Sequence, residues 1–138
     1  MESSSAELCN CFAVRQAARR ITRLYERHLS EAGLTSAQFS ILVTVGEREG
    51  ITMAELAEAM GMDRTTLLRA LKPLTRQGWV RASKGDAPRQ LHLSLTTPGR
   101  RQQALAAQRW QAAQHEFENE VGRERAARLR RDLLHLPF

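Results

Sequence analysis

The hydrophobic positions of the chain recur mostly with the period of an α-helix. Each stretch in which apolar residues return every three or four positions predicts an amphipathic helix. These stretches are residues 7–30, 35–48, 52–60, 64–77, 98–121 and a last one after Gly122. Two short segments, 79–83 and 90–95, predict β-strands instead, the second by strict alternation of apolar and polar residues. We therefore expect a mainly α-helical protein with one small antiparallel sheet.

Two of the short helices predict a helix-turn-helix. Thr52 begins the first with the spacing of a capping box, Gly61 allows a tight turn, and Asp63 caps the second. Two short helices joined by a turn that contains glycine have the layout of this motif. The inward-facing set expected for the second helix is Leu67, Leu68, Leu71 and Leu74. Pro73 lies within this helix, where a proline removes one backbone hydrogen bond and bends the axis.

The two predicted strands follow directly after this motif. Residues 84–89 lie between them and have the composition of a turn with a basic tip. A helix-turn-helix followed by a β-hairpin predicts a winged helix. The long helices on either side, 7–30 and 98–121, have apolar faces larger than a small winged helix can cover. We expect them to bury one another across a two-fold axis in a homodimer, the alternative being an extended monomer.

Positive charge is concentrated in the middle of the chain. Its 138 residues contain 21 Lys and Arg against 15 Asp and Glu, a net charge of +6. Residues 64–101 contain nine of these basic residues and one acidic residue, so this segment carries +8 and the rest of the chain −2. Such asymmetry favours a polyanionic partner such as nucleic acid. The predicted second helix places Thr65, Arg69, Lys72 and Arg76 opposite its leucines, with Arg64 at its tip, as major-groove binding requires.

Several other classes of protein find no support in the sequence. The polar and acidic N-terminus and the lack of a long apolar run predict a cytoplasmic protein without a membrane span. Gly-rich phosphate loops and the GxSxG and HExxH motifs are missing, and the four histidines are scattered. We therefore expect neither an enzyme nor a bound metal or cofactor. Two cysteines cannot form a disulfide framework.

The order of the predicted elements resembles the MarR family of bacterial regulators. Residues 63–81 (DRTTLLRALKPLTRQGWVR) are similar to that family's recognition helix and first wing strand, and residues 95–99 (LTTPG) resemble its Leu-Thr-x-x-Gly. The resemblance implies a homodimer that binds double-stranded DNA at a pseudo-palindromic operator, with repression as the default. It divides the chain into an N-terminal dimerisation helix (1–34), a winged helix-turn-helix lobe (35–97) and C-terminal dimerisation helices (98–138).

The resemblance also implies roles for individual residues. Arg64, Thr65, Thr66 and Arg69 would contact the major groove, Lys72 and Lys84 the phosphates, and Arg89 the minor groove. In the family, an aspartate two residues earlier usually orients the wing arginine. Here Asp86 stands three residues earlier, so this sequence departs from the family pattern.

Two expectations concern release from DNA. The segment Leu8-Cys9-Asn10-Cys11-Phe12 is similar to the site of the reactive cysteine in the family's branch that senses organic hydroperoxides, and Cys11 matches that cysteine better than Cys9 because Phe12 follows it. The alternative is that both thiols are inert. MarR-like dimers also usually hold a small aromatic ligand near the dimer helices. Trp110, His28 and Arg19 are candidates for lining such a cleft, although ordinary core or surface roles are open to them as well.

Two other functions remain open from the sequence. A winged helix can serve protein–protein assembly, and it can bind DNA without sequence preference as an architectural protein. DNA affinity that is absent or insensitive to salt would favour the first, and a specificity ratio near one would favour the second.

Overall fold

The computed structural model describes residues 6–85 and 90–138. Its elements are α1 (Asn10–Leu29), α2 (Ser36–Glu47), β1 (Ile51–Thr52), α3 (Met53–Met60), α4 (Arg64–Arg76), β2 (Val80–Lys84), β3 (Leu91–Leu95), α5 (Thr97–Val121) and α6 (Arg123–Leu134). Single 3-10 turns, Ala6–Leu8 and Ser30–Ala32, lie before and after α1. The expected class, a mainly α-helical winged helix-turn-helix with long terminal helices, is confirmed.

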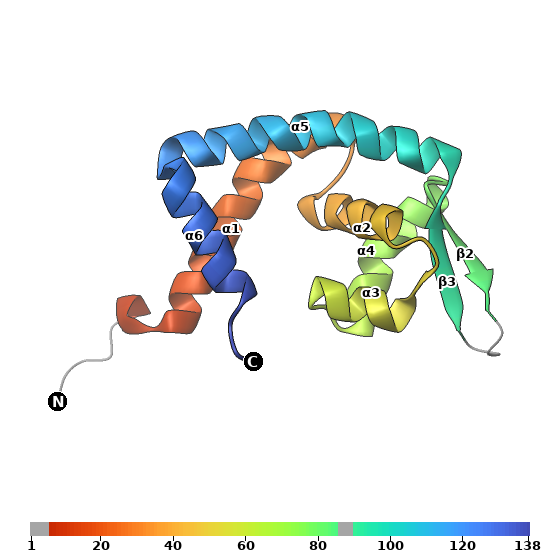
Figure 1. Cartoon of the computed structure of the whole chain (residues 1–138), viewed down its shortest axis with the longest axis horizontal. Helices are drawn as coiled ribbons and strands as arrows, with labels where there is room; N and C mark the ends of the chain where they lie inside the picture. The colour runs from red at the N-terminus through yellow and green to blue at the C-terminus, as the bar shows by residue number, and fades with distance from the viewer. Residues whose placement is uncertain (1–5, 86–89) are drawn as a thin grey trace.

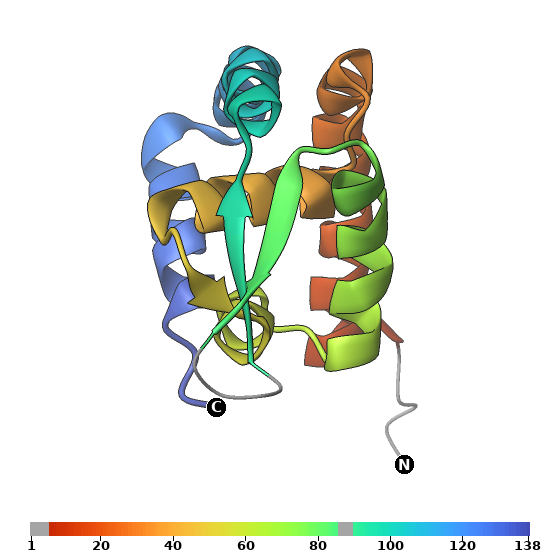
Figure 2. The ribbon, with the colours of Figure 1, turned by 90° about the vertical axis from the view of Figure 1, so that its right-hand side faces the viewer.

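The molecule consists of two parts joined by α5 (Figure 1). The long helix α5 runs across both, with α1 and α6 each packed against it at one end and the lobe of α2, α3, α4 and the sheet at the other. Figure 2 shows the sheet in front of α2, with α4 to one side of it. The core lies within the lobe, where Ile41, Leu42, Leu56, Leu67 and Leu74 are fully buried.

The sheet has three strands in the order β1-β3-β2, all antiparallel. β2 and β3 form the predicted hairpin, in the register Val80 to Leu95 and Lys84 to Leu91. The two-residue strand β1 is an addition to the prediction, because two residues are too few to show a period. Ile51 of β1 pairs with Leu93, which connects the base of the wing to the start of α3.

Several predicted positions differ from the structure. Leu68 is 46% exposed although we expected it among the inward-facing leucines, because it lies at the edge of the arc that the buried Leu67, Leu71 and Leu74 define. Leu91 is exposed too, since it stands beyond the core toward the wing tip. Leu136, which the apolar period after Gly122 assigns to the last helix, follows the end of α6 at Leu134. In contrast to these differences, α4 continues past Pro73 to Arg76, in agreement with the helix predicted over 64–77.

The junction between the wing and α5 explains the LTTPG segment. Thr96 caps α5 by accepting a hydrogen bond from the Gly99 amide at 3.0 Å, and the Thr96 amide donates to the Trp79 carbonyl at 3.0 Å. Gly99 is buried here, and a Cβ atom at this position would overlap the Trp79 carbonyl oxygen. Glycine is therefore required for the close approach of α5 to the chain before β2.

Large apolar surfaces are exposed on the α1–α6 arm, which is the part of the molecule formed by α1, the C-terminal end of α5, and α6. Phe12 and Val14 of α1 are exposed, although Val14 belongs to the stripe predicted for this helix. The exposed leucines of α6 and the tail are Leu129, Leu133, Leu134 and Leu136. An apolar groove of about 370 Å³ between α1, α5 and α6 continues this surface, with Tyr25, Phe117 and Leu133 among its lining residues.

Candidate nucleic-acid interface

The turn between α3 and α4 has the geometry that a helix-turn-helix needs. Gly61 ends α3 in the left-handed conformation, at a φ of 63°, which glycine adopts without the strain that a Cβ atom would add. Asp63 then caps α4, and its carboxylate accepts hydrogen bonds from the Thr66 amide at 2.7 Å and the Thr66 hydroxyl at 3.0 Å. These bonds, the amide first, lower the pKa of Asp63. The start of α4 is therefore defined by a charged cap.

The outward face of α4 is polar and basic. Arg64, Thr65, Thr66, Arg69 and Lys72 are all exposed, and Arg76 follows in the last turn. The helix itself contains no acidic residue. Within the described part of the chain, no carboxylate forms an ion pair with Arg64, Arg69 or Lys72. The structure thus brings together five of the seven predicted DNA contacts on one helix, although the Thr66 hydroxyl already donates to Asp63.

The wing carries the other two predicted contacts. Lys84 is exposed as the last residue of β2. Arg89 and Asp86 lie outside the described residues, so the predicted minor-groove contact and its aspartate stay predictions.

A histidine that the sequence prediction passed over, His92, lies near the tip of the wing, one residue after Leu91. The His92 Nδ1 atom is 2.8 Å from the Gly50 carbonyl oxygen, and the ring occupies the space beside Gly85 that a side chain there would need. His92 therefore links the hairpin to the segment before β1. The strand pattern placed His92 on the polar face of β3 but offered no sign of this contact.

The two cysteines lie on the other part of the molecule, at the start of α1. Cys9 is the N-cap residue, and its Sγ atom accepts a hydrogen bond from the Phe12 amide at 3.4 Å. Cys11 is the second residue of the helix; both thiols are free and exposed. They share a small cavity of about 260 Å³ with Phe12, Arg15 and Arg19.

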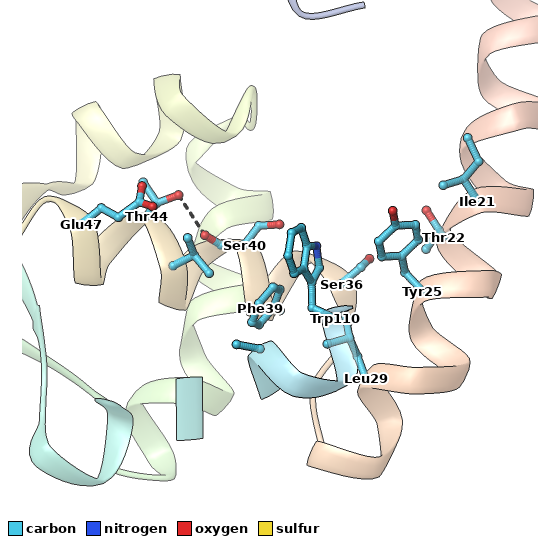
Figure 3. Close-up of a pocket in the computed structure, with 12 residues that line it drawn as sticks. Ile21, Thr22, Tyr25, Leu29, Ser36, Phe39, Ser40, Thr44, Glu47 and Trp110 are labelled. Atoms are coloured by element: carbon cyan, nitrogen blue, oxygen red, sulfur yellow. Dashed lines mark hydrogen bonds between the residues drawn. The ribbon is translucent and has the colours of Figure 1, made fainter. Parts of the chain in front are cut away.

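A larger cavity of about 670 Å³ lies where α1, α2 and α5 meet (Figure 3). Its aromatic lining comes from Tyr25, Phe39 and Trp110, and the rings of Phe39 and Trp110 stack with their centroids 6.4 Å apart. Hydroxyl groups of Thr22, Ser36, Ser40 and Thr44 and the Glu47 side chain add polar atoms. The cavity is therefore mostly apolar with a few polar groups, as small-molecule sites commonly are.

Only one of the three candidates for lining a ligand cleft lies at this cavity. Trp110 lines it, whereas Arg19 lies in the cysteine cavity. His28 is held by Glu116 of α5, with its Nε2 atom 2.6 Å from the Glu116 carboxylate. Hydrogen bonds from His28 first, and then from Arg27, lower the pKa of Glu116. This contact joins α1 to α5 next to the cavity instead of facing into it.

Tyr25 borders both the aromatic cavity and the apolar groove of the α1–α6 arm. Its hydroxyl donates to the Gln114 side-chain oxygen of α5. Burial is the main reason that the pKa of Tyr25 is raised, and the negative charge of Glu118 acts in the same direction. The sequence pattern assigned Tyr25 only to the apolar stripe of α1, since periodicity does not reveal that two cavities meet at one ring.

In residues 6–85 and 90–138, no group of three or more His, Cys, Asp or Glu side chains is placed to hold a metal ion. No helix in the same residues is both long and apolar enough to cross a membrane.

The chain is similar to known transcriptional regulators over most of its length. Residues 32–87 match the model of the MarR family. The transcriptional regulator TtmR of Methylorubrum extorquens is 37% identical over 65% of this chain and 47% of its own length. SarZ of Staphylococcus epidermidis is 30% identical over 82% of this chain and 76% of its own. The organic hydroperoxide resistance regulator of Bacillus subtilis is 28% identical over 64% of this chain and 61% of its own.

Among solved structures, the M. tuberculosis transcriptional regulator MosR in complex with DNA has 38% sequence identity and a TM-score of 0.82. The similarity covers 91% of each chain. The match to TtmR, by contrast, spans about half of that protein's length.

Proposed function

Because the chain belongs to the MarR family of winged helix-turn-helix transcriptional regulators, we propose that it binds a pseudo-palindromic operator as a homodimer and represses transcription there. The observation that carries the proposal is the outward face of α4, which is exposed, basic and free of acidic residues at the second helix of the motif. In such motifs the N-terminal half of the second helix contacts base edges in the major groove. The sequence predicted a protein without enzymatic activity, and the MarR family is a family of regulators and not of enzymes.

Each contact then has a chemical role. Arg64 and Arg69 read base edges, with Thr65 and Thr66 beside them, because a guanidinium can donate two hydrogen bonds to guanine. Lys72 and Lys84 bind phosphates as point charges. Arg89 enters the minor groove, which attracts arginine where it is narrow.

Dimerisation is proposed through the α1–α6 arm, residues 1–34 and 98–138. The exposed apolar side chains of α1, α6 and the tail support this, because a second copy would remove them from water. A two-fold dimer sets two recognition helices about one DNA turn apart, near 34 Å.

Release from DNA is proposed to follow from a change in the spacing of the two lobes. The aromatic cavity is suited to a small aromatic ligand, since it lies between the dimer arm and the DNA-binding lobe. A ligand that prefers one spacing shifts the population toward it.

In a Trp79→Phe variant, an effector in this cavity should quench the fluorescence of Trp110 as it releases DNA. Release without quenching would place the effector elsewhere.

We expect Arg64→Ala to lower the affinity for the operator by about 1–3 kcal/mol and to relax the preference at one base pair in each half-site. The reason is the loss of hydrogen bonds to a base edge that phosphate contacts cannot replace. Binding to the operator and to single-base variants of it measures both effects. Arg76→Ala is the matched control, because Arg76 lies in the last turn of the same helix and should weaken all sequences equally. Equal loss on all sequences with Arg64→Ala would make Arg64 a phosphate contact.

Oxidation of Cys11 is proposed as a second means of release. The Cys11 thiolate would attack the terminal oxygen of an organic hydroperoxide and become a sulfenic acid as the O–O bond breaks, and the leaving alkoxide would take a proton from water to become the alcohol. Cys11→Ser should bind DNA like the reduced wild type and remain bound after treatment with cumene hydroperoxide. Cys9→Ser is the control, because serine can keep the N-cap hydrogen bond, and it should still be released. Release of Cys11→Ser by the oxidant would remove Cys11 as the sensor.

A further inference from the structure

An apolar side chain stands within the basic surface of α4. Leu68 is 46% exposed, whereas its neighbours Leu67, Leu71 and Leu74 are buried. No other large apolar side chain of α4 is exposed. Leu68 is therefore not needed to fill the core, and its role has to be sought on the outside of the helix.

The neighbours of Leu68 on the helix surface place it at the proposed DNA contact. Residues three and four positions apart are adjacent on a helix, so Arg64 and Thr65 precede Leu68 on this surface and Lys72 follows it. All three are exposed. The exposed leucines of α6 belong instead to the arm proposed for dimerisation. Leu68 thus lies on the other part of the molecule, among the side chains that are proposed to contact DNA.

The major groove presents one apolar group to such a side chain. Thymine displays a C5-methyl group there, and neither guanine, adenine nor unmodified cytosine does. The arginine guanidinium and the threonine hydroxyl recognise hydrogen-bonding atoms of the bases. A leucine side chain can stabilise the complex only through apolar contact. A thymine methyl that covers Leu68 would remove both groups from water.

We propose that Leu68 is a specificity-determining residue, which contacts the C5-methyl group of a thymine beside the base pairs that Arg64 and Arg69 reach. The inference rests on the proposed function, since it requires α4 to enter the major groove. It adds a preference for thymine at one position of each half-site. Burying one methyl group should raise the affinity about fourfold. Because the operator has two half-sites, the two thymine methyl groups together should raise it about tenfold or more.

The test removes the methyl group from DNA and the leucine from the protein separately. An operator is first selected from random duplexes with the wild-type protein. Each thymine of a half-site is then replaced by deoxyuridine, which lacks only the methyl group, in both half-sites together. Dissociation constants are measured by fluorescence anisotropy. For the wild type, one replacement should weaken binding about tenfold, and for Leu68→Ala the same replacement should have no effect.

Two further variants make the result specific. Leu105→Ala removes a leucine of α5 with nearly the same exposure, 47%, and should retain the full effect of deoxyuridine. Leu68→Gln replaces the apolar side chain by a polar one of similar size and should lose the effect as Leu68→Ala does. Thermal unfolding of each variant checks that the fold is intact.

The outcomes separate this inference from the function on which it rests. Failure to select any operator would contradict the proposed function itself. A selected operator with no methyl-sensitive thymine would overturn the role of Leu68 and leave the function standing. The same holds if the effect of deoxyuridine persists in both Leu68 variants.

Discussion

Replacing Gly99 by alanine should destabilise the fold by about 3 kcal/mol. The added methyl group would overlap the Trp79 carbonyl oxygen, which is a backbone atom and already accepts a hydrogen bond from the Thr96 amide. Inserting a methyl group into a packed site costs about 1–3 kcal/mol, and the upper end applies because backbone can yield only by moving α5 or β2. Urea denaturation at a fixed protein concentration measures the change, since the stability of a dimer depends on concentration.

Gly46→Ala is the matched control for this prediction. A Cβ atom there would lie 2.8 Å from the Gln103 side-chain oxygen and 3.0 Å from a Leu95 methyl carbon. Both are side-chain atoms, and the glutamine can turn away. The gain in helix propensity from glycine to alanine, up to about 1 kcal/mol, should offset much of the remaining crowding. Equal stability of the two variants would mean that the close approach at Gly99 does not constrain the fold.

The affinity for DNA should fall about a thousandfold or more between 50 and 200 mM salt. A homodimer presents the segment 64–101, with nine basic residues and one acidic residue, twice. Three to five phosphate contacts from each subunit would release enough counterions to give a loss of about 10³–10⁵. The measurement is the slope of the logarithm of the binding constant against that of the salt concentration.

The slope measured for single-residue variants shows how much each basic residue contributes to the salt dependence. Lys72→Ala and Lys84→Ala should each reduce it by about one unit per subunit, or about two in the dimer, and should weaken all sequences alike. Arg128→Ala, an exposed position of α6 on the other part of the molecule, should leave the slope unchanged. Binding that does not respond to salt would contradict the phosphate contacts and favour the protein–protein assembly module.

The elements with strong periodicity could be predicted from the sequence, and the exceptions have physical causes. Caps and glycines around 35–78 placed α2, α3 and α4 to within a residue or two, since those residues satisfy the free amides and carbonyls of helix ends. The two residues of β1 could not be predicted because only their pairing with β3 makes them a strand. Leu68 was wrongly assigned to the buried face of α4. A leucine at the border between the buried and the exposed face fits the apolar pattern in either position.

The candidate site could be predicted only in part, because the sequence pattern shows local features and not the contacts between distant segments. Charge and position identified the basic face of α4, since both are written in the local sequence. The aromatic cavity joins Tyr25, Phe39 and Trp110 from three helices far apart in the chain, and such a meeting depends on tertiary packing. The contact of His92 with Gly50 likewise joins the wing to a segment about 40 residues earlier in the chain.

The most direct test of sequence-specific regulation is the ratio of the protein's affinities for specific and nonspecific DNA. An operator selected from random duplexes and a scrambled duplex of the same composition would each be titrated with the protein by fluorescence anisotropy, at one salt concentration near the physiological one. Sequence-specific binding by a homodimer predicts that the operator binds at least about a thousandfold more tightly, as two protein subunits on one duplex. A ratio near one would contradict sequence-specific regulation and leave an architectural DNA-binding protein in its place.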